Sequence, residues 1–111
     1  MYKLSLNRIH DRVRITEGDE RMDLRVDADP MRMVAGLNEA QRRLKTITDD
    51  TTTEEMREIA TYFAGVMFGA DQAAALLEFY HDDAACVINV CGKYFSDRLS
   101  KLIAKAQKRM K

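Results

Sequence analysis

The stretch that organises this chain runs from Tyr62 to Asp83 and reads Tyr-Phe-Ala-Gly-Val-Met-Phe-Gly-Ala-Asp-Gln-Ala-Ala-Ala-Leu-Leu-Glu-Phe-Tyr-His-Asp-Asp. One helical pattern ends in it and another begins, with Gly69 between them. Glycine suits a helix C-terminus because it enters the left-handed conformation without a Cβ penalty. Asp71 is expected to cap the next helix by accepting hydrogen bonds from first-turn amides. These features predict the packing of helices and show no catalytic chemistry.

Apolar residues on both sides of this junction recur at steps of three and four, which is the period of one helix face. Before it, a helix is predicted from near residue 53, where Thr52 and Glu55 match a capping box. After it, helices are predicted to begin near residues 71 and 83, and Asp82 or Asp83 is expected to cap the second of these helices. The last of these is predicted to be the longest, with the apolar stripe Val87, Ile88, Cys91, Tyr94, Phe95, Leu99, Leu102, Ile103 and Ala106.

Two further features of the last helix carry predictions. Gly92 lies inside it, where glycine costs about 1 kcal/mol relative to alanine. It therefore predicts a close helix contact. The apolar stripe from Cys91 to Ile103 is longer than a small helical core needs, which predicts self-association.

Working toward the N-terminus, alternating apolar and polar residues predict an antiparallel hairpin at residues 11–27. The turn is Glu17-Gly18-Asp19-Glu20, with glycine supplying a positive φ angle. On the polar face, Arg12 and Arg14 are expected to pair with Asp23 and Asp27. The expected apolar face is Val13, Ile15, Met22, Leu24 and Val26.

Two signals flank the hairpin. Tyr2, Leu4 and Leu6 alternate with polar residues and predict a further short strand. Asp29-Pro30 is a helix start, with aspartate as cap and proline at the first helical position. The fold class predicted is α+β and mainly α: an N-terminal β-hairpin region at residues 1–28 and a bundle of about four helices at 29–111, a single compact helical domain.

Composition narrows the function classes. The 111 residues are enough for one domain with a real core. Lys and Arg together number 18, as do Asp and Glu, so net charge argues against electrostatic capture by nucleic acid or an anionic membrane. No apolar run has the form of a signal peptide or a membrane span. Cys86 and Cys91 lie too far apart on a helix for a disulfide and are expected to be small apolar residues of a cytoplasmic protein.

Catalytic chemistry is not expected. His10-Asp11 and His81-Asp82-Asp83 are the clusters that could suggest metal or acid–base chemistry, but neither has partners at metal-ligand spacing. A strand edge explains the first, and a loop with a helix cap explains the second. The sequence has no nucleophile motif and no glycine-rich phosphate loop. We expect no enzyme, no metal and no cofactor.

Candidate functional residues are therefore those that could contact a partner. The aromatic residues could instead be core, because stripes at helical spacing usually fill a core. The lysines could be the solvated face of an amphipathic helix, or could follow a phosphate backbone. The candidates are Phe68, Phe79, Tyr80, Tyr94, Arg98, Lys101 and Lys105.

Three segments from Thr52 onward resemble small proteins encoded in the tail-gene region of long-tailed bacteriophages and prophages, chiefly of Gram-positive hosts. The tail assembly chaperones are the functional group that the resemblance indicates. In that group an aromatic helix ends at Phe-Gly, and helices with apolar-aromatic pairs precede a basic end. The matching segments are Phe63-Ala-Gly-Val-Met-Phe-Gly-Ala-Asp-Gln, Leu76-Leu-Glu-Phe-Tyr, and Lys93-Tyr-Phe with Arg98-Leu-Ser-Lys-Leu-Ile.

The resemblance implies a non-enzymatic helper in the bacterial host cytoplasm. Such proteins hold the helical tape-measure protein until the tail tube polymerises around it, and they contact tail-tube subunits. A homo-oligomer would multiply weak contacts into avidity. Two other functions stay open: a small nucleic-acid-binding or regulatory module that uses the basic C-terminal helix, and a structural tail or connector component retained in the virion.

Overall fold

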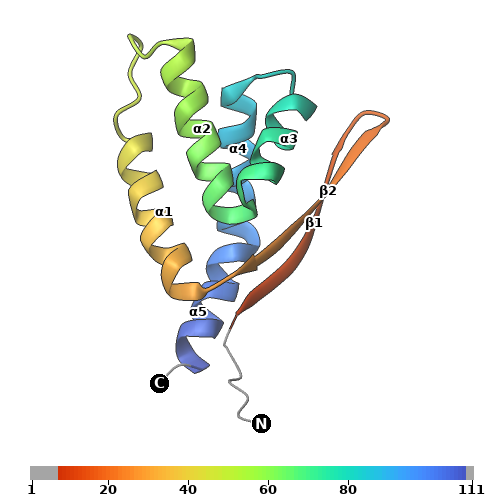
Figure 1. Ribbon diagram of the computed structural model, residues 1–111, viewed down its shortest axis with the longest axis vertical. Helices are drawn as coiled ribbons and strands as arrows, with labels where there is room; N and C mark the ends of the chain where they lie inside the picture. The colour runs from red at the N-terminus through yellow and green to blue at the C-terminus, as the bar shows by residue number, and fades with distance from the viewer. Residues whose placement is uncertain (1–7, 110–111) are drawn as a thin grey trace.

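A computed structural model describes residues 8–109 of the chain (Figure 1). It confirms the predicted fold class, an N-terminal antiparallel hairpin followed by four helices. The strand predicted at residues 2–6 lies outside the described residues. The elements are β1 (Ile9–Glu17), β2 (Glu20–Ala28), α1 (Pro30–Leu44), α2 (Thr53–Phe68), α3 (Ala70–Phe79), and a last helical run made of α4 (Ala84–Tyr94), the π turn η1 (Phe95–Leu99) and α5 (Ser100–Arg109).

The hairpin follows from strict alternation along both strands. Gly18 has φ of +60° in the two-residue turn, as predicted. Arg14 lies opposite Asp23, and its Nε is 2.8 Å from the Asp23 carboxylate, so this pair is confirmed. The expected pairing of Arg12 with Asp27 is wrong, because the register places Arg12 opposite Arg25.

The helix starts have local causes. Asp29 accepts a hydrogen bond from the Arg32 amide at 3.2 Å and caps α1. Thr52 accepts one from the Glu55 amide at 3.1 Å, and its hydroxyl donates to the Glu55 carboxylate at 3.0 Å, so half of the predicted capping box forms. Asp83 caps α4 by accepting from the Cys86 amide at 3.2 Å.

The junction between α2 and α3 is tighter than expected. Gly69, with φ of +88°, is both the C-cap of α2 and the N-cap of α3, and no side chain caps α3. The prediction that Asp71 caps α3 is wrong, because the helix already begins at Ala70 and Asp71 lies within its first turn. A single glycine therefore turns the chain.

The last helical run contains a π turn that the periodicity did not reveal. Buried positions follow a helical spacing up to Tyr94, and the next buried residue is Leu99, five positions later. Five residues match one π-type turn, in which hydrogen bonds join residues i and i+5. The extra residue keeps the buried stripe on one side and leaves Arg98 exposed.

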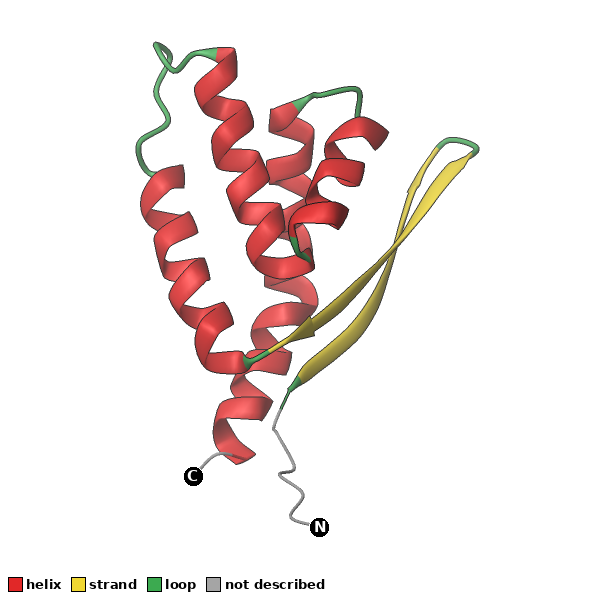
Figure 2. Ribbon diagram, viewed as in Figure 1, coloured by secondary structure: helices red, strands yellow, loops and turns green. Residues whose placement is uncertain are grey.

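The core lies among the helices and at the base of the hairpin. Leu24 and Val26 of β2 are almost fully buried, and β2 packs on α2 and α3. The base of β1 contacts α5, and so does α1. Figure 2 shows the hairpin as an arm that runs across the helices and ends in a turn beyond them, and Glu17 beside this turn still contacts Tyr80 at the end of α3. The end of the long apolar stripe is thus covered partly by the chain itself.

Candidate partner-binding groove

An open groove of about 720 Å³ lies between α1 and the last helical run, which are in contact at α5. One wall is the stripe of α1 from Val34 to Leu44, and Phe63 of α2 also lines the groove. The other wall comes from α4, η1 and α5. Its apolar residues are half-buried except Phe63 and Ile103, which are buried, and they are Val34, Leu37, Leu44, Phe63, Ile88, Phe95 and Ile103. Polar residues at the groove are asparagine, glutamine, serine and Lys93.

Two glycines show how differently α1 meets its neighbours. A Cβ on Gly36 would lie 2.8 Å from Cγ1 of Val66, so α1 and α2 are in close contact there. A Cβ on Gly92 would meet nothing within 4 Å. The close helix contact predicted at Gly92 is wrong for the described chain, because this residue lines the groove.

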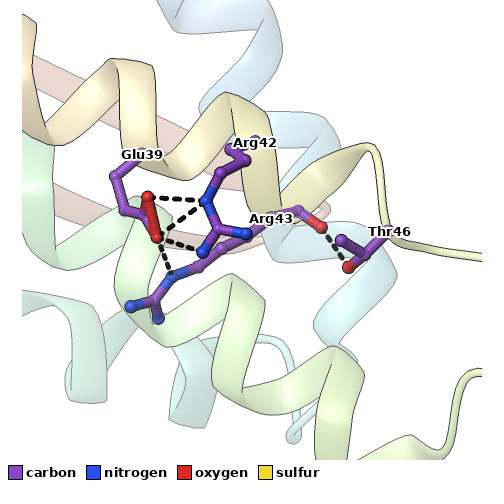
Figure 3. Close-up of polar contacts among 4 residues, drawn as sticks. All are labelled: Glu39, Arg42, Arg43 and Thr46. Carbon is purple, nitrogen blue, oxygen red and sulfur yellow. Dashed lines mark hydrogen bonds and ion pairs between the residues drawn. The ribbon is translucent and has the colours of Figure 1, made fainter.

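Polar contacts fix the α1 wall on its outer side (Figure 3). Glu39 lies between Arg42 and Arg43, with its carboxylate 2.9 Å from Arg42 Nε and 3.3 Å from Arg43 Nε. Hydrogen bonds from Arg42, and then from Arg43, lower the pKa of Glu39 to about 2. The Arg43 guanidinium lies 3.8 Å from the ring centre of Tyr62 on α2, a cation–π contact. The ion pairs lie within α1, and the cation–π contact joins α1 to α2.

The structure places two of the candidate aromatic residues in the core. Phe68 is 6% exposed and Tyr94 is 9% exposed, and their ring centres are 5.7 Å apart. The Tyr94 hydroxyl donates to the Asp11 carboxylate at 2.7 Å, and Arg98 donates to the same oxygen. This contact ties β1 to the last helical run.

Burial and hydrogen bonding act in opposite directions on the pKa of Asp11 and in the same direction on the pKa of Tyr94. Burial raises the pKa of Asp11, but hydrogen bonds from Arg98 and Tyr94 outweigh it, and the pKa is lowered. Burial raises the pKa of Tyr94, and the bond to Asp11 raises it further. Asp11 is therefore charged and Tyr94 neutral near pH 7, which suits a structural ion pair.

The remaining candidates lie on other surfaces. Phe79 and Tyr80 are half-buried at the end of α3, in an edge-to-face pair with ring centres 5.1 Å apart. The Tyr80 hydroxyl donates to Glu17 in β1 at 3.1 Å, and burial followed by this bond raises its pKa to about 12. Lys101 and Lys105 are exposed on α5. The structure does not gather the candidates into one site.

The groove residues were missed because their signal is ambiguous in a sequence. Val34, Leu37 and Leu44 belong to the apolar stripe of α1 and are read as core, and only the packing shows that they are half-buried. Polar neighbours on the same side, Asn38 and Gln41, interrupt the stripe and could have marked its border. Periodicity reports that a face is apolar but does not say what covers it.

Three further findings concern metal binding, the buried thiol and the membrane. Within residues 8–109, no three His, Cys, Asp or Glu side chains are grouped so that they could hold a metal ion. Cys91 is fully buried, which raises the pKa of its thiol to about 12 and makes it unreactive. None of the helices described is long and apolar enough to cross a membrane.

Comparison of the chain with models of protein families, with curated proteins and with solved structures gave no match.

Proposed function

We propose that this protein is a non-enzymatic binding protein that holds an amphipathic helix of a partner in the groove between α1 and the last helical run. The open groove is the observation that carries the proposal. Its walls are two helix faces with apolar residues at helical spacing. Gly92 has no side chain, and nothing lies within 4 Å of where its Cβ would be, so one wall has open space there. In helix-in-groove recognition, an amphipathic helix lays its apolar face into a hydrophobic groove of this kind.

The size of the groove favours a helix over a small molecule. The stripe from Val34 to Leu44 spans ten residue steps, or about 15 Å at the rise of an α-helix. Two to three turns of a partner helix would lie along it. A small ligand usually has most of its surface enclosed, with a few polar groups converging on it. This groove is partly open to solvent, and its polar residues come from both walls.

In its specific form, the proposal is that the protein is a phage tail assembly chaperone. The resemblance from Thr52 onward supports this form, and the groove suits the apolar helical stripes of a tape-measure protein. We propose the tape-measure protein as the main partner, the tail-tube subunit as a second one, a homo-oligomer as the working form, and the bacterial host cytoplasm as the location. A chaperone should be absent from finished particles, whereas a structural tail or connector component would remain in them.

The general proposal is tested with a fluorescein-labelled synthetic helix that carries leucine at helical spacing, followed by fluorescence anisotropy. Gly92→Leu should fill the groove and weaken binding at least tenfold. Gly65→Leu is the matched control, because Gly65 lies in α2 outside the groove and also has open space around it. Equal binding by both variants, or no binding by the parent protein, would exclude the groove as a helix site.

The specific form needs a second experiment. The protein is co-expressed with a tape-measure protein from a long-tailed phage, and co-purification is compared between the parent and Gly92→Leu. Tape-measure protein that stays soluble only with the parent supports the chaperone. Helix-peptide binding without any effect on the tape-measure protein would keep the groove function and reject the phage assignment.

The nucleic-acid alternative has one observation in its favour. Lys101, Lys105 and Lys108 are exposed on α5, and none forms an ion pair with another described residue. Size-exclusion chromatography with absorbance at 260 and 280 nm and light scattering separates the two functions. A 260 nm signal that salt removes would favour the nucleic-acid module, since phosphate contacts depend strongly on salt.

A further inference from the structure

The outer face of the hairpin carries a charge pattern that its own fold does not neutralise. Residues that alternate with the buried row point away from the helices and are exposed. We call this surface the arginine face: His10, Arg12, Arg14, Thr16, Arg21, Asp23, Arg25 and Asp27. Arg14 pairs with Asp23, and Asp27 pairs with Arg8 at 2.7 Å. No ion pair with a described residue holds Arg12 or Arg25.

Arg12 and Arg25 lie directly opposite each other. The amide and carbonyl of Arg25 point away from β1, because both bond to the side chain of Gln72 at 2.7 Å. The two arginines therefore form a non-hydrogen-bonded pair, the kind in which cross-strand side chains are closest. Like charges directly opposite destabilise a sheet. An anionic group from outside would relieve this repulsion.

The two edges of the hairpin are also different. At the β2 edge, the side-chain amide of Gln72 bonds both the amide and the carbonyl of Arg25, as a neighbouring strand would. β2 also packs on α2 and α3. The β1 edge has no strand beside it among residues 8–109. By the alternation of the ladder, the backbone groups of His10, Arg14 and Thr16 point outward from this edge, while the Arg12 amide bonds the Asp11 carboxylate. Such an edge is a template for another strand.

We propose that the β1 edge binds an extended protein segment with Asp or Glu at alternate positions, which adds a third strand to the hairpin. Main-chain hydrogen bonds would give affinity, and carboxylates beside Arg12 and Arg14 would give specificity. Residues of the segment on the inner face would lie beside Val13, which is half-buried. A third strand would also stabilise the arm, since a two-stranded hairpin is marginal.

Charge selects this occupant over two others. A second copy of β1 in antiparallel pairing would place the rows containing Arg12 and Arg14 next to each other, which is repulsive. Duplex DNA needs a continuous basic track, whereas the turn of the hairpin carries Glu17, Asp19 and Glu20. An acidic strand limited to the middle of β1 avoids both conflicts.

The test uses a fluorescein-labelled peptide of alternating Glu and Val, with fluorescence anisotropy on the full chain. Arg12→Glu should weaken binding by about tenfold or more, because it replaces an attraction with a repulsion. The same change places a glutamate opposite Arg25, which favours the hairpin, so lost binding would not reflect unfolding. Arg32→Glu on α1 is the matched control, since Arg32 is exposed and lies on a helix outside the arginine face.

Peptide chemistry supplies the other controls. A peptide of alternating Lys and Val should not bind, and N-methylation of alternate amides in the Glu peptide should abolish binding by removing ladder donors. Equal losses for Arg12→Glu and Arg32→Glu, or unchanged binding after N-methylation, would overturn the proposal. Tighter, salt-sensitive binding of duplex DNA would assign the arginine face to nucleic acid. A dimer in light scattering that Arg12→Glu disrupts would assign the edge to a second copy.

Discussion

The last helical run, residues 84–109, has two sides that the molecule uses differently. On one side, Cys91 and Leu99 are fully buried, and Tyr94 contacts Asp11 in the hairpin. On the other, Ile88 and Phe95 are half-buried, and Gly92 leaves open space at the groove. The packed side supplies stability, and the open side leaves apolar surface for a partner. An apolar helix face therefore does not by itself belong to the core.

The π turn η1 maintains the difference between the two sides. An uninterrupted α-helix would bring residue 98 to the packed side, four residues after Tyr94. Because of the π turn, Leu99 and not Arg98 lies on the packed side, and the Arg98 side chain forms an ion pair with Asp11. Single π turns of this kind occur often at functional sites. Here the turn also places Phe95 and Ser96 in the groove wall.

The largest expected effect is a large-to-small change on the packed side. Leu99→Ala should lower the free energy of unfolding by about 2–5 kcal/mol, because it leaves a cavity in a fully buried site. Phe95→Ala on the groove side should cost less than half as much despite removing a larger side chain. Urea unfolding followed by circular dichroism measures both. Equal costs would show that the groove side is packed like the core.

The next effect concerns the hydroxyl of Tyr94. Tyr94→Phe keeps the ring contact with Phe68 but removes one donor to Asp11, and it should cost about 1–2 kcal/mol. Tyr80→Phe is the matched control, because its acceptor Glu17 is exposed, and we expect a cost below about 0.5 kcal/mol. Thermal unfolding of the two variants under one condition gives the comparison. A larger loss in Tyr80→Phe would place the main hairpin contact at α3.

The third effect has the opposite sign. Gly92→Ala should raise the free energy of unfolding by about 1 kcal/mol, because alanine favours a helix and nothing obstructs its Cβ. Gly36→Ala makes the same chemical change on the contact between α1 and α2. It should destabilise, since the new Cβ meets stiff, branched Val66 at 2.8 Å. Val66→Ala in the Gly36→Ala background should restore stability, and a double-mutant cycle measures that coupling.

Sequence reasoning found the elements of this fold because their signals are local. Gly18 and Gly69 mark positions where the backbone needs a positive φ, and Asp29 and Asp83 cap helices through bonds three residues away. Hairpin alternation and helix periodicity each depend on neighbours in the chain. The predicted helix starts near residues 30, 53, 71 and 83 are within one residue of the observed ones.

The contacts that define the candidate surfaces could not be found in this way because they join distant segments. Asp11 is bonded to Tyr94 and Arg98, and the backbone of Arg25 to the side chain of Gln72. No periodic pattern reports such pairs. Gly36 and Gly92 have the same chemistry in a sequence, and only the tertiary arrangement shows that one contacts a neighbouring helix and the other does not.

The smallest effect is the pH dependence of the packed side. The folded-state pKa of Asp11 lies below its ordinary value of 3.8, so its ion pair stabilises the fold above that value. The contribution is lost as the pH falls through the folded-state pKa. The difference in unfolding free energy between the parent and Asp11→Asn should therefore be constant near neutral pH and shrink at acid pH. Urea midpoints measured from about pH 7 to about pH 2.5 test this. Glu39→Gln is the matched acid-to-amide change on the outer face of α1, where the ion pairs with Arg42 and Arg43 are more exposed to solvent and are expected to contribute less at every pH. A difference that grows on acidification would mean that burial, not the bonds from Arg98 and Tyr94, dominates at Asp11.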